Sequence, residues 1–162
     1  MIFTPLPLQG SYLIEMEKIR DQRGYNARAW CQGEMAEHGL ATMIAQINVI
    51  QNDARGTVRG FHFQHPPMAE AKLFRVTRGS IFDVIIDLRR ESPTFLQSTS
   101  VELSAGSGRL LYVPERFGQG SRRSRTTPSS PTRSRPPTRP ATATASAGTT
   151  PCSRSTGLCL AG

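Results

Sequence analysis

The amino-acid sequence predicts an all-β fold of the sandwich or barrel type. Short β-prone runs recur at regular spacing through the first 120 residues, and turn residues separate them. Only one short segment has the pattern of a helix. The chain has 162 residues, which is enough for one domain with a real core.

The N-terminal part is expected to supply edge strands and the single helix. Two prolines restrict residues 1–7 to an edge strand or an extended arm. Residues 12–17 alternate as a strand, and residues 25–30 resume an extended pattern after a polar turn. A short helix is expected over residues 32–38, because a glycine follows it. Residues 43–49 alternate again and predict another strand.

The middle of the chain is expected to form the main strands. Two of them, residues 57–64 and 71–76, flank a His-Pro-Pro turn. Residues 80–88 are the most β-prone segment of the chain. Two further strands, residues 99–103 and 109–113, are joined by a glycine-rich link.

Residues 56–79 carry the side chains that point to chemistry. Strict alternation places Arg59 and His62 on opposite faces of a strand, but a bulge at Gly60 would bring them together. Lys72 lies on the strand after the turn. We therefore expect a histidine base, a lysine cation and a phosphate-binding guanidinium to meet in one pocket.

Charge and composition divide the chain in two. The net charge is +8, yet residues 1–120 carry 13 Lys and Arg against all 12 acidic residues. Residues 121–162 carry seven arginines, no acidic residue and no aromatic residue. We expect residues 1–120 to form the domain and residues 121–162 to be a disordered, low-complexity basic tail.

The cysteines and the hydropathy pattern favour the cytoplasm. Three cysteines without metal-ligand spacing argue against a disulfide framework. We find no apolar run long enough to cross a membrane and no secretory signal. We therefore expect a cytoplasmic protein without a membrane partner.

The central stretch resembles the first cupin signature. Gly56, His62, Glu70 and Gly79 stand near the positions of its glycines, first histidine and glutamate, but Gln64 replaces the second histidine. The second signature is matched by Gly108, Pro114 and Arg116, while Gln119 replaces its histidine. One imidazole and scattered carboxylates make a poor metal site, so we expect a cupin without metal or other cofactor.

A closer resemblance covers residues 1–120 almost without gaps. The segments DQRGYNARAW, GTVRGFHFQ and EAKLFRVTRGSIFDVIIDLR resemble the dTDP-4-dehydrorhamnose 3,5-epimerase family. The resemblance implies a jelly-roll cupin barrel, a homodimer and an isomerase of carbohydrate biosynthesis. Its substrate would be dTDP-4-dehydro-6-deoxyglucose, a nucleotide sugar on the way to dTDP-L-rhamnose.

The resemblance also implies roles for individual residues. His62 would be the base that removes the protons at C3 and C5, and Lys72 would stabilise the enolate charge. Arg23 and Arg59 would hold the pyrophosphate. Each assignment has a structural alternative. His62 could be a hydrogen-bonded histidine of the core, and the lysine and the arginines could be solvated surface charges.

Three polar residues complete the expected substrate site. Gln46 and Asn48 would line the nucleotide and sugar site, although both could be outward polar positions on an edge strand. Gln119 would occupy the position of a family histidine, within PERFGQGS instead of PEGFAHGF.

The basic tail suggests an out-of-frame reading of the family's C-terminal part. Residues 121–130, SRRSRTTPSS, can be back-translated and re-read with one base added in front to give FQTLEDDTEL, as the family has at this point. The expected catalytic tyrosine would then be missing near Pro131 or Thr132, so the domain would be incomplete and at most weakly active. The alternative is a non-catalytic cupin whose tail binds polyanions, although specific nucleic-acid binding is disfavoured because the tail lacks aromatic residues.

Overall fold

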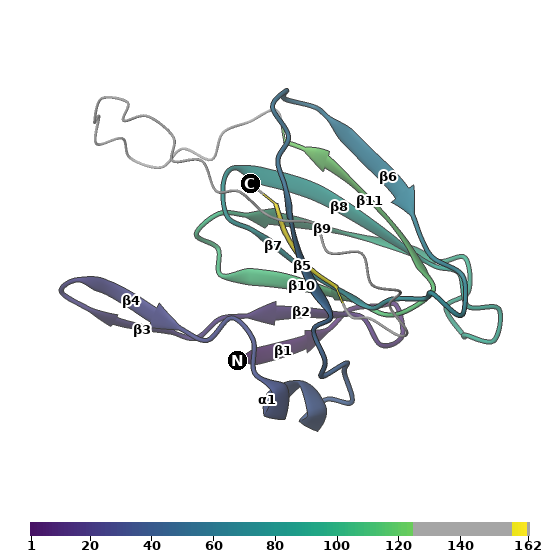
Figure 1. Cartoon of the computed structure of the whole chain (residues 1–162), viewed down its shortest axis with the longest axis horizontal. Helices are drawn as coiled ribbons and strands as arrows, with labels where there is room; N and C mark the ends of the chain where they lie inside the picture. Colours follow the sequence, from purple (N-terminus) through teal and green to yellow (C-terminus); the bar gives the residue numbers. More distant parts are fainter. Residues whose placement is uncertain (125–156, 162) are drawn as a thin grey trace.

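The computed structural model describes residues 1–124 and 157–161, the last five by their backbone alone. Two β-sheets face each other, and a small two-stranded sheet projects from one side (Figure 1). Apart from one short helix, the regular structure of the described residues is entirely β. The predicted all-β fold of two packed sheets is therefore confirmed.

The strands are ordered as follows. The six-stranded sheet contains β1 (Ile2–Pro5), β2 (Tyr12–Glu15), β10 (Arg109–Val113), β7 (Lys72–Val76), β12 (Gly157–Ala161) and β5 (Gln46–Ile50), in that order. The four-stranded sheet contains β6 (Val58–His62), β11 (Phe117–Arg123), β8 (Ser80–Asp87) and β9 (Ser98–Ser104), in that order. The projecting sheet pairs β3 (Lys18–Asp21) with β4 (Gly24–Ala27).

Alternation along β7 and β10 divides the core into two clusters. On β10, Leu111 and Val113 belong to the cluster between the two sheets, which β8, β9 and β11 complete from the other side. Leu110 and Tyr112 belong to a second cluster, which includes Met35 of helix α1 (Gln32–Glu37). Successive strand residues thus bury opposite faces of one sheet, as the period of two requires.

The helix lies where the sequence predicts it. It begins after Cys31 and ends at His38, and Gly39 follows with a φ of +66°. Glycine adopts this left-handed conformation without steric cost, so it ends the helix and turns the chain back toward the core.

Three strands are additional to those the sequence predicts. β3 lies before the expected turn, β11 begins in the domain and ends at Arg123, and β12 occupies residues 157–161. The end of β11 and all of β12 therefore lie within residues 121–162, which we expected to be a disordered tail. A strand can form there because its hydrogen bonds use backbone groups and need no apolar side chains. The rest of that predicted tail, residues 125–156 and 162, lies outside the described residues.

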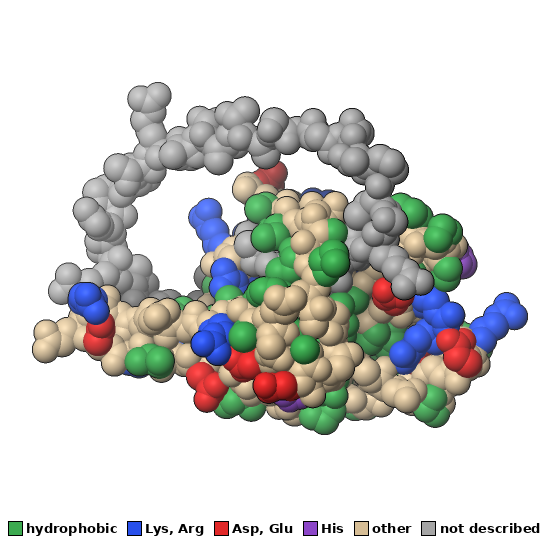
Figure 2. Space-filling view, turned by 60° about the horizontal axis from the view of Figure 1, so that its bottom comes forward, with side chains coloured by type: hydrophobic (Ala, Val, Ile, Leu, Met, Phe, Trp, Pro, Cys, Tyr) green, Lys and Arg blue, Asp and Glu red, His purple; other side chains and the backbone are tan. Residues whose placement is uncertain are grey.

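Several large apolar side chains remain on the surface. Ile19 is 75% exposed, Val49 77% and Val58 68%. Apolar side chains are visible among the charged ones on the face drawn in Figure 2. No helix among the described residues has the length and apolar character of a membrane span.

Candidate functional site

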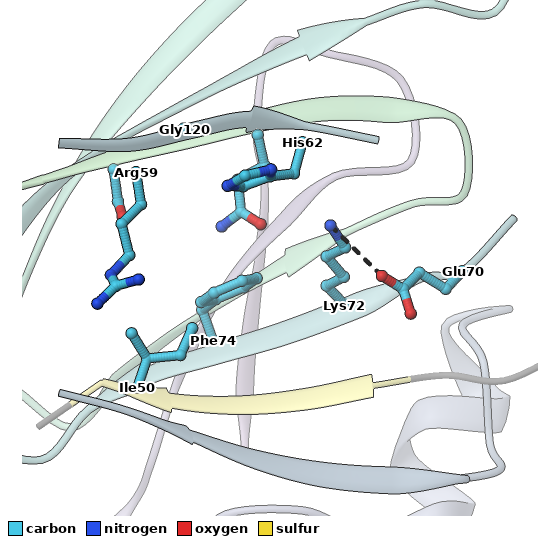
Figure 3. Close-up of a pocket in the computed structure, with 9 residues that line it drawn as sticks. Ile50, Arg59, His62, Glu70, Lys72, Phe74 and Gly120 are labelled. Atoms are coloured by element: carbon cyan, nitrogen blue, oxygen red, sulfur yellow. Dashed lines mark ion pairs between the residues drawn. The ribbon is translucent and has the colours of Figure 1, made fainter. Parts of the chain in front are cut away.

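A pocket of about 270 Å³ opens between the two sheets. β5 and β7 supply one wall, and β6 and β11 supply the other (Figure 3). It is lined by Ile50, Arg59, His62, Glu70, Lys72, Phe74, Gln119, Gly120 and Ser121. The same pocket is thus lined by Arg59, His62 and Lys72, which the sequence predicts to meet, and their chemical roles stay predictions.

A bulge at Gly60 brings Arg59 and His62 to the same pocket. His62 pairs with Gln119 and Arg59 with Ser121, so three steps along β6 match two along β11. Gly60 has a φ of +112°, and a Cβ there would lie 2.5 Å from the Cα of Gly120. Only glycine fits this approach, so Gly60 permits the bulge where β6 pairs with β11.

The histidine and the arginine occupy the β6 side of the pocket. Arg59 donates from Nε to Oδ1 of Asn52 at 2.5 Å and from Nη2 to the backbone oxygen of Gln51 at 3.1 Å. His62 is exposed, and its ring makes no hydrogen bond within residues 1–124. The guanidinium is thus held in place, while the imidazole is open to a ligand.

Lys72 approaches from the opposite sheet. Its Nζ lies 3.5 Å from Oε1 of Glu70, and both side chains are only 13% exposed (Figure 3). Phe74, two residues further along the same face of β7, supplies an apolar wall. The pocket therefore contains a partly buried ammonium group, that of Lys72, which forms an ion pair with Glu70.

A buried carboxyl group behind the pocket wall is not among the residues that sequence reasoning selected. Asp83 of β8 is 1% exposed and accepts hydrogen bonds from Nε2 of Gln119 at 3.2 and 3.0 Å. Burial raises the pKa of Asp83 to about 7, although the Gln119 hydrogen bond and the charge of Lys72 both lower it. The one available signal was an aspartate inside the apolar run SIFDVIIDL.

Arg23 is not brought to the pocket. It lies at the tip of the β3–β4 hairpin, where its side chain is 90% exposed and pairs with Asp21 at 2.6 Å. The hairpin forms a separate sheet that projects from the sandwich, so this arginine lies far from β6 (Figure 1).

Gln46 and Asn48 also lie outside the pocket lining. Both are on β5, on the face that they share with Ile50, which does line the pocket. Of the three residues on that face, only Ile50 reaches the pocket, and the expected place of Gln46 and Asn48 in the substrate site stays a prediction. Glu70, in contrast, lines the pocket although it is not among the predicted site residues. Only its spacing in the cupin signature had drawn attention to it.

The arrangement suits proton transfer next to a carbonyl group. An imidazole can remove a proton, and an ammonium ion across the pocket can stabilise the negative charge that develops. A guanidinium at the same pocket can bind a phosphate. Within the described residues, no three His, Cys, Asp or Glu side chains gather as metal ligands.

Comparison with known proteins points to one family of enzymes. The profile of the dTDP-4-dehydrorhamnose 3,5-epimerase family matches residues 5–126. The epimerase of Methanothermobacter thermautotrophicus is 39% identical over 118 residues, which are 73% of this chain and 63% of the relative. That of Sinorhizobium fredii is 40% identical over 124 residues, with 74% and 62% covered.

Solved structures show the same likeness. The epimerase of Elizabethkingia anophelis has a TM-score of 0.73 at 34% identity, over 76% of this chain and 68% of that one. The epimerase of Bacillus anthracis, solved with TDP and pyrophosphate, has a TM-score of 0.65 at 29% identity, over 76% and 70%. The fold places this chain among the cupin-like all-β proteins.

The chain belongs to the dTDP-4-dehydrorhamnose 3,5-epimerase family. The matched region contains the whole described pocket and continues six residues past Gly120, the expected end of the domain. The chain spans a little under two thirds of the length of the two curated relatives above.

Proposed function

We propose that this chain abstracts and returns protons at C3 and C5 of dTDP-4-dehydro-6-deoxyglucose, as a 3,5-epimerase. The observation that carries the proposal is the placement of His62 and Lys72 on facing walls of one pocket, with Arg59 beside them. Family membership supports the substrate class, because solved relatives hold dTDP-4-keto-L-rhamnose or dTDP-quinovose.

The chemistry follows from the acidity of protons next to a ketone. His62 takes the proton from the carbon beside C4, and the carbonyl oxygen gains negative charge. Lys72 stabilises that charge across the pocket, where its side chain is only 13% exposed. Inversion of the carbon requires that an acid delivers a different proton to the opposite face, while solvent takes up the proton held by His62. No metal is needed for this sequence of steps.

Arg59 and the apolar wall that Phe74 supplies bind the nucleotide part of the substrate. Arg59, already held by Asn52, presents a guanidinium to the pyrophosphate without a large loss of side-chain freedom. Arg23, Gln46 and Asn48 remain assigned to the substrate by the family resemblance alone. We also propose that the chain forms a homodimer and that it is located in the cytoplasm.

The test is solvent-deuterium exchange into the nucleotide sugar. The chain is incubated with dTDP-4-dehydro-6-deoxyglucose in D₂O, and proton NMR follows the loss of the C3 and C5 signals. We expect exchange in the wild type and none in His62→Ala. His65→Ala is the matched control, because His65 contacts Phe63 outside the pocket and exchange should persist.

The same experiment distinguishes two epimerases. A relative from Streptomyces niveus, 36% identical over 121 residues, carries the name dTDP-4-dehydrorhamnose 3-epimerase. Exchange at C3 alone would assign this chain to that activity, and exchange at both carbons to the 3,5-epimerase. Retained exchange in His62→Ala would remove this histidine from the base role.

We expect slow turnover, because the pocket residues include no tyrosine to return the proton. The predicted position of that tyrosine, near residues 131 and 132, lies outside the described residues. Resequencing the gene across the codons for Phe117 to Arg125 tests the frame hypothesis. An additional base there should restore the family sequence, and the restored protein should turn over faster.

The non-catalytic alternative gains no support from the relatives reported above, which are all named as sugar-nucleotide epimerases. Two of the tail arginines, Arg122 and Arg123, lie in β11. Arg123 donates from Nη1 to the backbone oxygens of Asn52 and Asp53, so this donor is already used within the domain.

A further inference from the structure

Asp83 lies one layer behind the catalytic pocket. Its carboxylate accepts both of its described hydrogen bonds from the amide nitrogen of Gln119, which lines the pocket. Its cross-strand partner on β11 is Ser121, another lining residue. The carboxyl group is thus buried next to the site without being part of its surface.

The surroundings of Asp83 contain few charged groups. Lys72 of β7 acts on it electrostatically, and Glu70 accompanies that lysine at 3.5 Å. His62 of β6 lies across β11, opposite Gln119. On the other side, β9 places the apolar Val101 opposite Asp83. Among these groups, Lys72 is the one whose charge lowers the pKa of Asp83.

A purely structural role explains this arrangement poorly. A buried ionised carboxylate normally needs several donors, and a single amide nitrogen is a weak provision for it. The nitrogen end of the Gln119 amide is committed to Asp83, so its oxygen end is the one left for a ligand in the pocket.

We infer that Asp83 is a positioning residue that sets the positive charge Lys72 presents to a bound keto sugar. The inference rests on the proposed function. When Asp83 is neutral, Lys72 offers its charge to the enolate oxygen. When Asp83 is ionised, part of that charge is neutralised from behind the pocket wall.

The ionisation of Asp83 falls in a pH range that is accessible to experiment. Burial raises the pKa of Asp83 to about 7, and the Gln119 hydrogen bond and Lys72 oppose that shift. Below this value the carboxyl group holds its proton, and above it the group is ionised. Turnover should therefore fall as the pH rises through about 7, once the base itself is in its active form.

The first test needs no activity. Carbon-13 NMR of aspartate-labelled protein follows the titration of the Asp83 carboxyl carbon in the whole chain. We expect a midpoint near 7 in the wild type and a higher midpoint in Lys72→Met, because the lowering charge is gone. Lys18→Met is the matched control, since Lys18 lies on the β3–β4 hairpin, over the ring of Tyr25.

The second test is the pH dependence of kcat for deuterium exchange. Asp83→Asn keeps the shape and an acceptor for Gln119 but cannot ionise. We expect this variant to match the wild type at pH 6 and to exceed it by about tenfold at pH 8.5, with KM little changed. Asp53→Asn, which removes an exposed carboxylate, should keep the wild-type profile.

The outcomes separate the two proposals. A midpoint for Asp83 that does not move in Lys72→Met overturns the inference whatever the activity. An Asp83→Asn profile that still falls above pH 7 overturns it as well. Absence of exchange in the wild type contradicts the proposed function, and the NMR titration then still decides whether Asp83 and Lys72 are coupled.

Discussion

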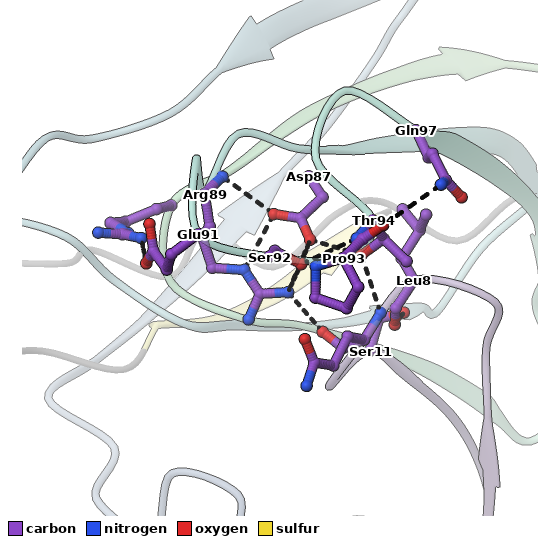
Figure 4. Close-up of polar contacts among 11 residues, drawn as sticks. Leu8, Ser11, Asp87, Arg89, Glu91, Ser92, Pro93, Thr94 and Gln97 are labelled. Carbon is purple, nitrogen blue, oxygen red and sulfur yellow. Dashed lines mark hydrogen bonds and ion pairs between the residues drawn. The ribbon is translucent and has the colours of Figure 1, made fainter.

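Two buried aspartates four residues apart on β8 meet opposite conditions. Asp83 is 1% exposed and accepts hydrogen bonds from one amide nitrogen. Asp87 is 0% exposed and accepts from the backbone, Nε and Nη2 of Arg89 and from the hydroxyls of Ser92 and Thr94 (Figure 4). Both side chains are closed to solvent, yet one carboxyl group is under-supplied with donors and the other is fully supplied.

The pKa values of the two groups diverge accordingly. Burial raises the pKa of both carboxyl groups. At Asp83 it prevails and brings the pKa to about 7. At Asp87 the hydrogen bonds from Arg89, Ser92 and Thr94 outweigh burial and hold the pKa well below its usual range. The different supply of donors therefore contributes to the opposite directions of the two pKa shifts.

The difference matches the two locations. Arg89 also donates to the backbone oxygen of Gln9 and lies 4.8 Å from the ring centroid of Phe117. The Asp87 network thus joins the N-terminal arm, the loop after β8 and the core, which is a structural task. Asp83 instead adjoins the pocket, where a group that changes its charge near neutral pH can affect chemistry.

The largest expected effect comes from removing the charge of Asp87. Asp87→Asn leaves the guanidinium of Arg89, only 20% exposed, without its ionic partner. We expect the free energy of unfolding to fall by about 3 kcal/mol, as measured by urea denaturation at pH 7. Asp83→Asn is the matched comparison and should cost under about 1 kcal/mol. Equal losses in the two variants would contradict the assigned difference.

The pH dependence of stability should separate the pair next. Folded Asp83 binds its proton more tightly than the unfolded chain does, so its contribution to stability is present below about pH 4 and is lost as the pH rises to about 7. Asp87 has a lowered pKa, so its contribution is present above about pH 4 and is lost on further acidification. Urea midpoints measured from pH 3 to 8 should show a decline above pH 4 that Asp83→Asn removes. A decline that persists in this variant would assign it to another group.

The smallest effect concerns one donor of the Asp87 network. Thr94 donates its hydroxyl to Oδ2 of Asp87 at 2.6 Å, and Thr94→Val removes that donor while keeping the volume. We expect a loss of about 1 kcal/mol in the free energy of unfolding. Thr99→Val on β9 should stay within about 0.5 kcal/mol, because it removes a half-buried hydroxyl outside this network. Similar values for both variants would show that the network is redundant.

The sequence by itself determined the parts of this protein that depend on neighbouring residues. Alternation and β-prone composition predicted all the strands except β3, β11 and β12, and glycine after residue 38 predicted the end of the helix. A glycine between Arg59 and His62 was enough to foresee the bulge that brings both to one pocket. These features can be predicted from the local sequence, because side-chain alternation along a strand and the left-handed conformation of glycine each depend on only a few residues.

The tertiary structure alone decided which distant residues meet. Asp83 reaches the site only because β8 pairs with β11, and Arg23 stays outside because its hairpin forms a separate sheet. The two aspartates of SIFDVIIDL look equivalent in the sequence, yet one faces a single amide and the other a cluster of donors. Hydrogen-bond supply at a buried position comes from neighbouring strands and loops, and their pairing is not written in any local pattern.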